Sequence, residues 1–160
     1  MKSAKLTFLT LALFVVGTSA ASAGSATANG SIALALAGVI APYSSLTSGE
    51  KYAVAAFFAG GTNVSYARKI SVTADKIVCR ISNVDITARS CELTFKNKKR
   101  TLRGREANEI FATEAMAGVP SDGAAGSVFE SLSKLNCTLD PKEIKEKAGG
   151  GANCSFETGN

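Results

Sequence analysis

The chain of 160 residues carries 18 lysines and arginines against 13 acidic residues, which gives a formal net charge of +5, and it contains no histidine. Without histidine, the Ser-His-Asp and Cys-His catalytic arrangements and all histidine metal sites are excluded. A chain of this length is typical of one domain with its own hydrophobic core.

The first 23 residues have the pattern of an export signal. Lys2 and Lys5 form a positive start, residues 6–16 form a short apolar core, and residues 21–23, Ala-Ser-Ala, have the small-x-small pattern that a signal peptidase cleaves. The apolar core is too short for a membrane-spanning helix, which needs about 20 residues. We predict a Sec-type signal cleaved after Ala23, no retained membrane anchor, and a single periplasmic or secreted domain over residues 24–160.

Two helices are expected early in this domain. Residues 31–41 are apolar on most sides and are followed by Pro42, which is typical of a buried helix. Residues 47–50, Thr-Ser-Gly-Glu, have capping-box spacing ahead of a helical apolar pattern. An alternative stays open, in which residues 24–46 are partly disordered after cleavage.

The four cysteines predict a covalent framework. The segments around Cys79 and Cys91 alternate apolar and polar residues, which predicts a hairpin, and a turn near Asp85 places the two cysteines opposite each other. Opposed strand residues are close enough for a disulfide. We therefore predict the pairs Cys79–Cys91 and Cys137–Cys154. The chain has no C-x-x-C spacing, which argues against a metal site.

The hairpin near residues 70–103 is expected to include a third strand at 101–103. A helix follows over about 107–115, and a second helix, opened by Ser121 or Asp122, is predicted from the spacing of Val128, Phe129, Leu132 and Leu135. Asp140 and Pro141 begin a last helix before a strand that carries Cys154 and Phe156. The prediction is an α+β fold, in which a small antiparallel sheet packs with several short helices and is stapled by two disulfides.

Two patterns bear on catalysis. Ser131 and Lys134 match the S-x-x-K pattern of serine acylases, but the partner motifs S-D-N and K-T-G are absent. On the expected helix, Ser131 lies on a solvated surface beside the buried face. Paired carboxylates are offered by Glu106, Glu109 and Glu114 of one expected helix and by Asp122 after it. Ion pairing with Arg103 and Arg105, which lie next to them, explains these acidic residues without an acid-base role. We therefore predict no catalytic, cofactor or metal site.

Positive charge is concentrated in one segment of ten residues. The run, called the basic segment below, consists of Lys96, Lys98, Lys99, Arg100, Arg103 and Arg105. At a hairpin tip it would attract an acidic protein or an anionic envelope component. It contains no aromatic residue to stack on bases, which weakens a nucleic-acid interpretation. Charge runs are common at turns, which favours the other interpretation of the run itself, in which these side chains are solvated and protect a sheet edge from unwanted pairing.

These features predict an exported bacterial protein that binds another macromolecule, as a binding or inhibitor-type protein without enzymatic activity. The basic segment is its expected contact surface. Two alternatives stay open. One is a structural or assembly component of the envelope that self-associates through residues 31–41, and the other is a small envelope hydrolase that uses Ser131 with Lys134, or Glu106 with Asp122.

Overall fold

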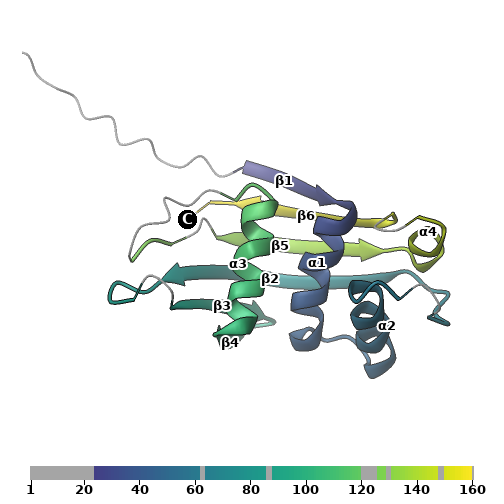
Figure 1. Cartoon of the computed structure of the whole chain (residues 1–160), viewed down its shortest axis with the longest axis horizontal. Coiled ribbons are helices and arrows are strands. Elements are labelled where there is room, and N and C mark those ends of the chain that lie inside the picture. Colours follow the sequence, from purple (N-terminus) through teal and green to yellow (C-terminus); the bar gives the residue numbers. More distant parts are fainter. Residues whose placement is uncertain are drawn as a thin grey trace, which may run out of the picture.

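The computed structural model describes residues 24–61, 64–85, 88–119, 126–128, 131–147 and 150–159. Six strands form one antiparallel sheet in the order β1-β6-β5-β2-β3-β4 (Figure 1). The strands are β1 (Gly24–Asn29), β2 (Ile70–Ile81), β3 (Arg89–Phe95), β4 (Lys98–Arg103), β5 (Leu132–Leu139) and β6 (Ala152–Thr158). The helices are α1 (Gly30–Ile40), α2 (Ser48–Phe58), α3 (Arg105–Met116) and α4 (Pro141–Glu146), with a 3-10 turn η1 at Ala41–Tyr43. The fold is therefore α+β, as the sequence predicts.

Both predicted disulfides are confirmed. In the β2–β3 hairpin, Cys79 lies opposite Cys91 in the predicted register, and the two are bonded. Cys137 of β5 lies opposite Cys154 of β6, and they form the second bridge. Structural disulfides are typical of proteins outside the reducing cytoplasm, so these two agree with a periplasmic or extracellular protein.

The predicted signal peptide, residues 1–23, lies outside the described residues. Among the helices of the described ranges, none combines the length and the apolar character that crossing a membrane requires.

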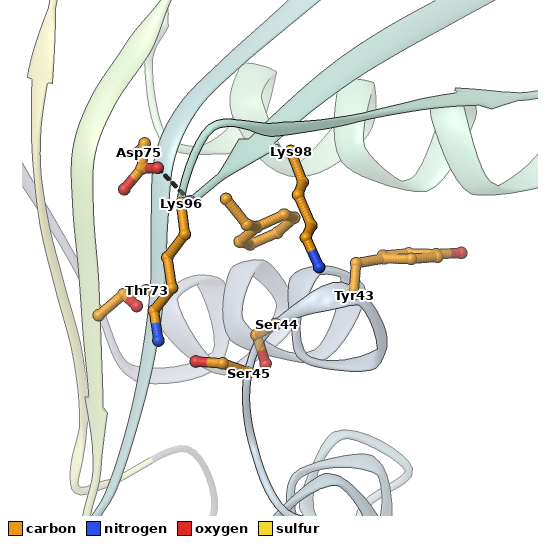
Figure 2. A pocket seen from close by; sticks show the side chains of 8 residues that line it. Tyr43, Ser44, Ser45, Thr73, Asp75, Lys96 and Lys98 are labelled. Carbon is orange, nitrogen blue, oxygen red and sulfur yellow. Dashed lines mark hydrogen bonds between the residues drawn. The ribbon is translucent and has the colours of Figure 1, made fainter.

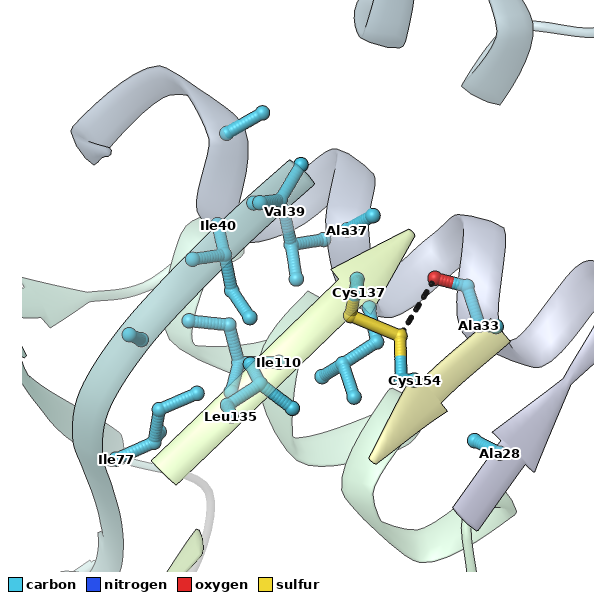
Figure 3. Close-up of a cluster of buried hydrophobic side chains, with 14 of the residues drawn as sticks. Ala28, Ala33, Ala37, Val39, Ile40, Ile77, Ile110, Leu135, Cys137 and Cys154 are labelled. Carbon is cyan, nitrogen blue, oxygen red and sulfur yellow. Dashed lines mark hydrogen bonds between the residues drawn. A yellow bond between two sulfur atoms is a disulfide. The ribbon is translucent and has the colours of Figure 1, made fainter. Parts of the chain in front are cut away.

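The core lies between one face of the sheet and the helices α1 and α3. α1 packs mainly on β6, while α3 packs on β3 and β4. Figure 3 shows Ile40 of α1 and Ile110 of α3 beside Leu135, and the Cys137–Cys154 bridge close to α1. Strand side chains that point to this face are buried, and the alternate ones, many of them Ser, Thr or Asn, face solvent on the other side. The sheet thus has one covered face and one open, polar face.

The N-terminal part of the domain adds a strand that the sequence does not predict. β1 pairs with β6 along its whole length, although Gly-Ser-Ala-Thr-Ala-Asn contains a single β-branched residue and no aromatic residue of the kind that indicates strands. α1 corresponds to the helix expected at 31–41, and its buried residues include Leu36 and Ile40. That segment lies in the core, so it does not present the apolar surface that self-association through it would need.

The prediction of a helix through Leu132 and Leu135 is wrong, because these residues belong to β5, between β6 and β2. The pairing with β6 shifts register near Lys134, whose φ is 51°. Such a bulge adds one residue between two inward-facing side chains, so the two leucines are three residues apart instead of two. Three is also the spacing of a helical face. Residues 121, 122 and 129 lie outside the described residues.

The other helix boundaries follow local sequence signals. Thr47 and Glu50 form the predicted capping box of α2, each accepting from the other's backbone N–H. The Asp140 side chain accepts from the N–H groups of Lys142 and Glu143 and so caps α4, which begins at Pro141. The helix expected at 107–115 is α3.

The close approach of α1 to Phe58 of α2 depends on Gly38. A Cβ at this position would lie 2.6 Å from Phe58 Cγ and 2.9 Å from its Cβ. We expect Gly38→Ala to lower the free energy of unfolding in urea by about 1–2 kcal/mol, because the clash outweighs the gain of about 1 kcal/mol in helix propensity. Gly49→Ala in α2 is the matched control, since a Cβ there meets nothing within 4 Å. Equal stability of the two variants would contradict this account.

Candidate binding surface

The basic segment begins at a tight turn and continues along an edge strand. Lys96 and Asn97 form the two-residue turn between β3 and β4, with positive φ values of 45° and 65°, as in a type I′ turn. Asp75 of β2 fixes this turn, because its Oδ2 accepts a hydrogen bond of 2.5 Å from the Lys96 backbone N–H. β4 lies at the edge of the sheet. Only the start of the segment is therefore at the hairpin tip.

Alternation along β4 divides the charges between the two faces of the sheet. Leu102 is buried, so Lys98 and Arg100, on the same side of the strand, point toward the helices. Lys99 and Arg103 point to the open face. The sequence run is therefore not one continuous surface.

Three of the six side chains of the basic segment already have an acidic or aromatic partner. Lys99 Nζ lies 2.8 Å from Glu92 Oε1, and Arg105 Nε lies 2.8 Å from Glu109 Oε1, so ion pairing accounts for Glu109 as predicted. The Arg100 guanidinium lies 5.4 Å from the centre of the Tyr43 ring. In the part of the chain that the structure describes, the other three members make no ion pair; these are Lys96, Lys98 and Arg103.

Tyr43 joins the end of α1 to α3 next to these charges. Its hydroxyl donates a hydrogen bond to Glu106 Oε1. Partial burial, followed by this hydrogen bond, raises the pKa of Tyr43 to about 12. The phenol is therefore neutral near pH 7 and remains a hydrogen-bond donor, so η1 is held against α3.

A recess of about 240 Å³ lies between η1 and the turn of the β3–β4 hairpin. Its lining consists of Tyr43, Ser44, Ser45, Thr73, Asp75, Phe95, Lys96 and Lys98. Figure 2 shows Lys96 extending alongside β2, with its ammonium group toward Thr73 and Ser45, and the ammonium group of Lys98 near Tyr43. The two unpaired lysines of the hairpin thus border one concave site. Arg103 instead lines a different hollow, together with Arg80 and Arg89.

Comparison of the chain with protein-family models, curated proteins and solved structures finds no match. A function therefore has to follow from its own residues. Within the described ranges, no group of three cysteine or acidic side chains is placed to hold a metal ion.

The candidate catalytic residues do not form a site among the described residues. Ser131 is buried ahead of β5, and its hydroxyl donates to the Gly159 carbonyl. The Lys134 ammonium lies at the bulge, 2.8 Å from Glu157 Oε1. The two side chains thus have separate partners, and Lys134 lies in a strand and not in the expected helix. Glu106 is bonded to Tyr43, and Asp122 lies outside the described residues.

One unusual side chain is Glu114 of α3, because the ion pairing that the sequence predicts for the acidic residues of this helix does not include it. Its exposed fraction is 0%, and neither carboxyl oxygen has a hydrogen-bond partner among the described residues. Burial raises its pKa to about 8, so the group is mainly a neutral acid at pH 7. Its spacing of three and four residues from Phe111 and Ile110, both buried, is the signal that could have placed it on the covered face. It does not line the recess at Lys96.

Proposed function

We propose that the protein is an exported, non-enzymatic binding protein that takes up an acidic segment of another protein at the recess bordered by Lys96 and Lys98. The observation that carries the proposal is this pair of lysines, which border a concave site and make no ion pair in the described part of the chain. Cations in such a position attract and orient a negatively charged partner.

Export is part of this proposal. Residues 1–23 carry the signal pattern, with cleavage after Ala23. The pairing of all four cysteines supports an oxidising compartment. An acidic partner would then be met in the periplasm or outside the cell.

The absence of catalysis rests on chemistry. The chain has no histidine, and a general base near neutral pH is most often histidine. The serine and lysine of the S-x-x-K pattern have separate hydrogen-bonding partners. The recess offers two ammonium groups, hydroxyls and one carboxylate that is already bound to a backbone N–H. This set is suited to holding an anion.

The test is removal of the two charges. We expect Lys96→Asn combined with Lys98→Thr to weaken binding of fluorescein-labelled poly-L-glutamate about tenfold at low ionic strength, because rim charges steer association. Asn tolerates the positive φ at position 96, and Thr suits a strand. The difference should shrink in about 0.5 M salt, since exposed charges are screened. Fluorescence anisotropy titration gives the affinities.

The matched control is Lys142→Ser combined with Lys145→Ser, which removes the same charge from exposed positions beside a different hollow. This control should bind poly-L-glutamate nearly as tightly as the wild type. Equal weakening of both double variants would mean that only net charge matters. Unchanged binding by the hairpin variant would refute the lysine pair as the contact site.

A further inference from the structure

Among the described residues, half of the central strand β2 has a neighbouring strand on one side only. β5 pairs with β2 from Ile70 to Ile77, whereas β3 pairs with it only from Lys76 to Ile81. At Phe95 the chain turns away into β4. Residues 70–75 therefore form a sheet edge on the side where β3 would continue, and Thr73 and Asp75 of this edge line the recess.

The pairing pattern identifies the backbone groups at this edge. The Cα atoms of Cys137 and Cys154 are 3.9 Å apart, which is the short separation of a non-hydrogen-bonded pair. The N–H and C=O of Cys137 therefore point away from β6 toward its other partner, Val72. Because direction alternates along a strand, Ser71 and Thr73 direct their N–H and C=O groups to the open side.

These backbone groups are available for a partner. Both Ser71 and Thr73 are exposed, and among the described residues no loop or turn hydrogen bond reaches their backbone atoms. A row of unpaired donors and acceptors on an edge is a template for another strand. The Lys96 side chain lies alongside this edge (Figure 2), where its charge discourages indiscriminate pairing and favours a strand that carries carboxylates.

We propose that this edge takes up an extended acidic peptide as an added strand, in the line of β3 beyond Phe95. The peptide main chain bonds to Ser71 and Thr73, and alternate acidic side chains reach Lys96 and Lys98. Strand addition of this kind draws affinity from main-chain hydrogen bonds and specificity from side chains. The inference rests on the proposed function for its acidic partner, and it adds the mode of recognition.

The decisive variant is Thr73→Pro, which removes the N–H at the open edge. Proline is tolerated where a strand has no neighbour. The hydrogen bonds from β2 to β5 use the backbone groups of Val72 and of the residues two positions before and after it, so Thr73→Pro leaves them in place. The matched control is Thr101→Pro in β4. Lys98 pairs with Phe95 across the two-residue turn, so the backbone groups of Lys98 point toward β3. Direction alternates along the strand, so the N–H of Thr101, three residues later, points outward at the other edge of the sheet.

The probe is a fluorescein-labelled peptide of four Thr-Glu repeats, titrated by anisotropy. We expect Thr73→Pro to weaken its binding at least about tenfold and Thr101→Pro to leave it within about twofold. Amide exchange of Thr73 in the wild type should slow when the peptide binds. A second peptide, methylated on every backbone nitrogen, keeps every charge but has no N–H group to donate along either edge, so it should lose the affinity. This comparison does not depend on how the variants fold.

Other outcomes separate the two proposals. Equal binding of the methylated and unmethylated peptides, sensitive to Lys96→Asn with Lys98→Thr, would refute strand addition and leave the acidic contact standing. Loss of binding in Thr101→Pro alone would move the site to β4 and overturn the assignment to β2. Dimerisation of the free protein in sedimentation, abolished by Thr73→Pro, would show that a second copy occupies the edge. No binding of the Thr-Glu peptide would refute the inference.

Discussion

The free energy of unfolding of the wild type is expected to fall as the pH rises from about 5 to about 8. The substitution Glu114→Gln is expected to remove most of this fall. The cause is the buried carboxyl on α3, whose exposed fraction is 0% and whose pKa is raised by burial from 4.5 to about 8. An ionised carboxylate without partners is strongly disfavoured in an apolar interior. The folded protein therefore keeps the proton that the unfolded chain releases.

The sign follows from the two pKa values of Glu114. Below pH 4.5 the carboxyl is protonated in both states, so the full stability is present. Between pH 4.5 and about 8 only the unfolded chain ionises, which costs about 1.4 kcal/mol per pH unit. Above about 8 both states ionise and the loss stays constant. The total is on the order of 5 kcal/mol, a large part of a domain's net stability.

Urea unfolding at pH 5 and pH 8 measures this loss. Glu114→Met should resemble the wild type at pH 5 and exceed its stability at pH 8, because an apolar side chain has no proton to release. Glu109→Gln is the matched control on the same helix, since Glu109 is partly exposed and paired with Arg105, and it should retain the pH dependence. A Glu114→Gln protein with the wild-type dependence would contradict the assignment.

Loss of the Cys137–Cys154 bridge is the second large effect. We expect Cys137→Ala with Cys154→Ala to lower the free energy of unfolding by about 3 kcal/mol, because the bridge closes a loop with a sequence separation of 17 residues. The bridge also lies in the core, where Cys154 Sγ is 3.4 Å from the Ala33 carbonyl oxygen of α1. Removing two buried sulfur atoms from this position adds a cavity cost.

The corresponding variant of the other bridge, Cys79→Ala with Cys91→Ala, provides the comparison. Its sequence separation is 12 residues and it lies within a hairpin, so its loss should cost somewhat less. Urea unfolding under oxidising conditions gives both values, and non-reducing peptide mapping confirms which bridge remains. Stability equal to the wild type in the Cys137 and Cys154 variant would contradict the role assigned to that bridge.

Local sequence signals were sufficient for much of the fold. The β2–β3 register follows from period-two alternation, and the opposed cysteines permit one consistent pairing, which leaves Cys137 with Cys154. The capping box at Thr47 and the cap at Asp140 follow from side chains that bond the first free N–H groups of their own helices. Each of these signals acts over a few residues or one strand pair, so it can be predicted from the amino-acid sequence.

The rest was decided by contacts between distant segments. β1 exists because β6, from the other end of the chain, pairs with it, and the bulge in β5 gave its leucines a helical spacing. Glu114 is buried because α3 lies across the sheet, and the open edge of β2 exists because β3 ends at Phe95. The sequence alone determined the alternation, the caps and the disulfides, all of which depend on local geometry. Only the tertiary structure decided which edges and side chains are covered, because burial depends on what packs against a segment and not on the segment itself.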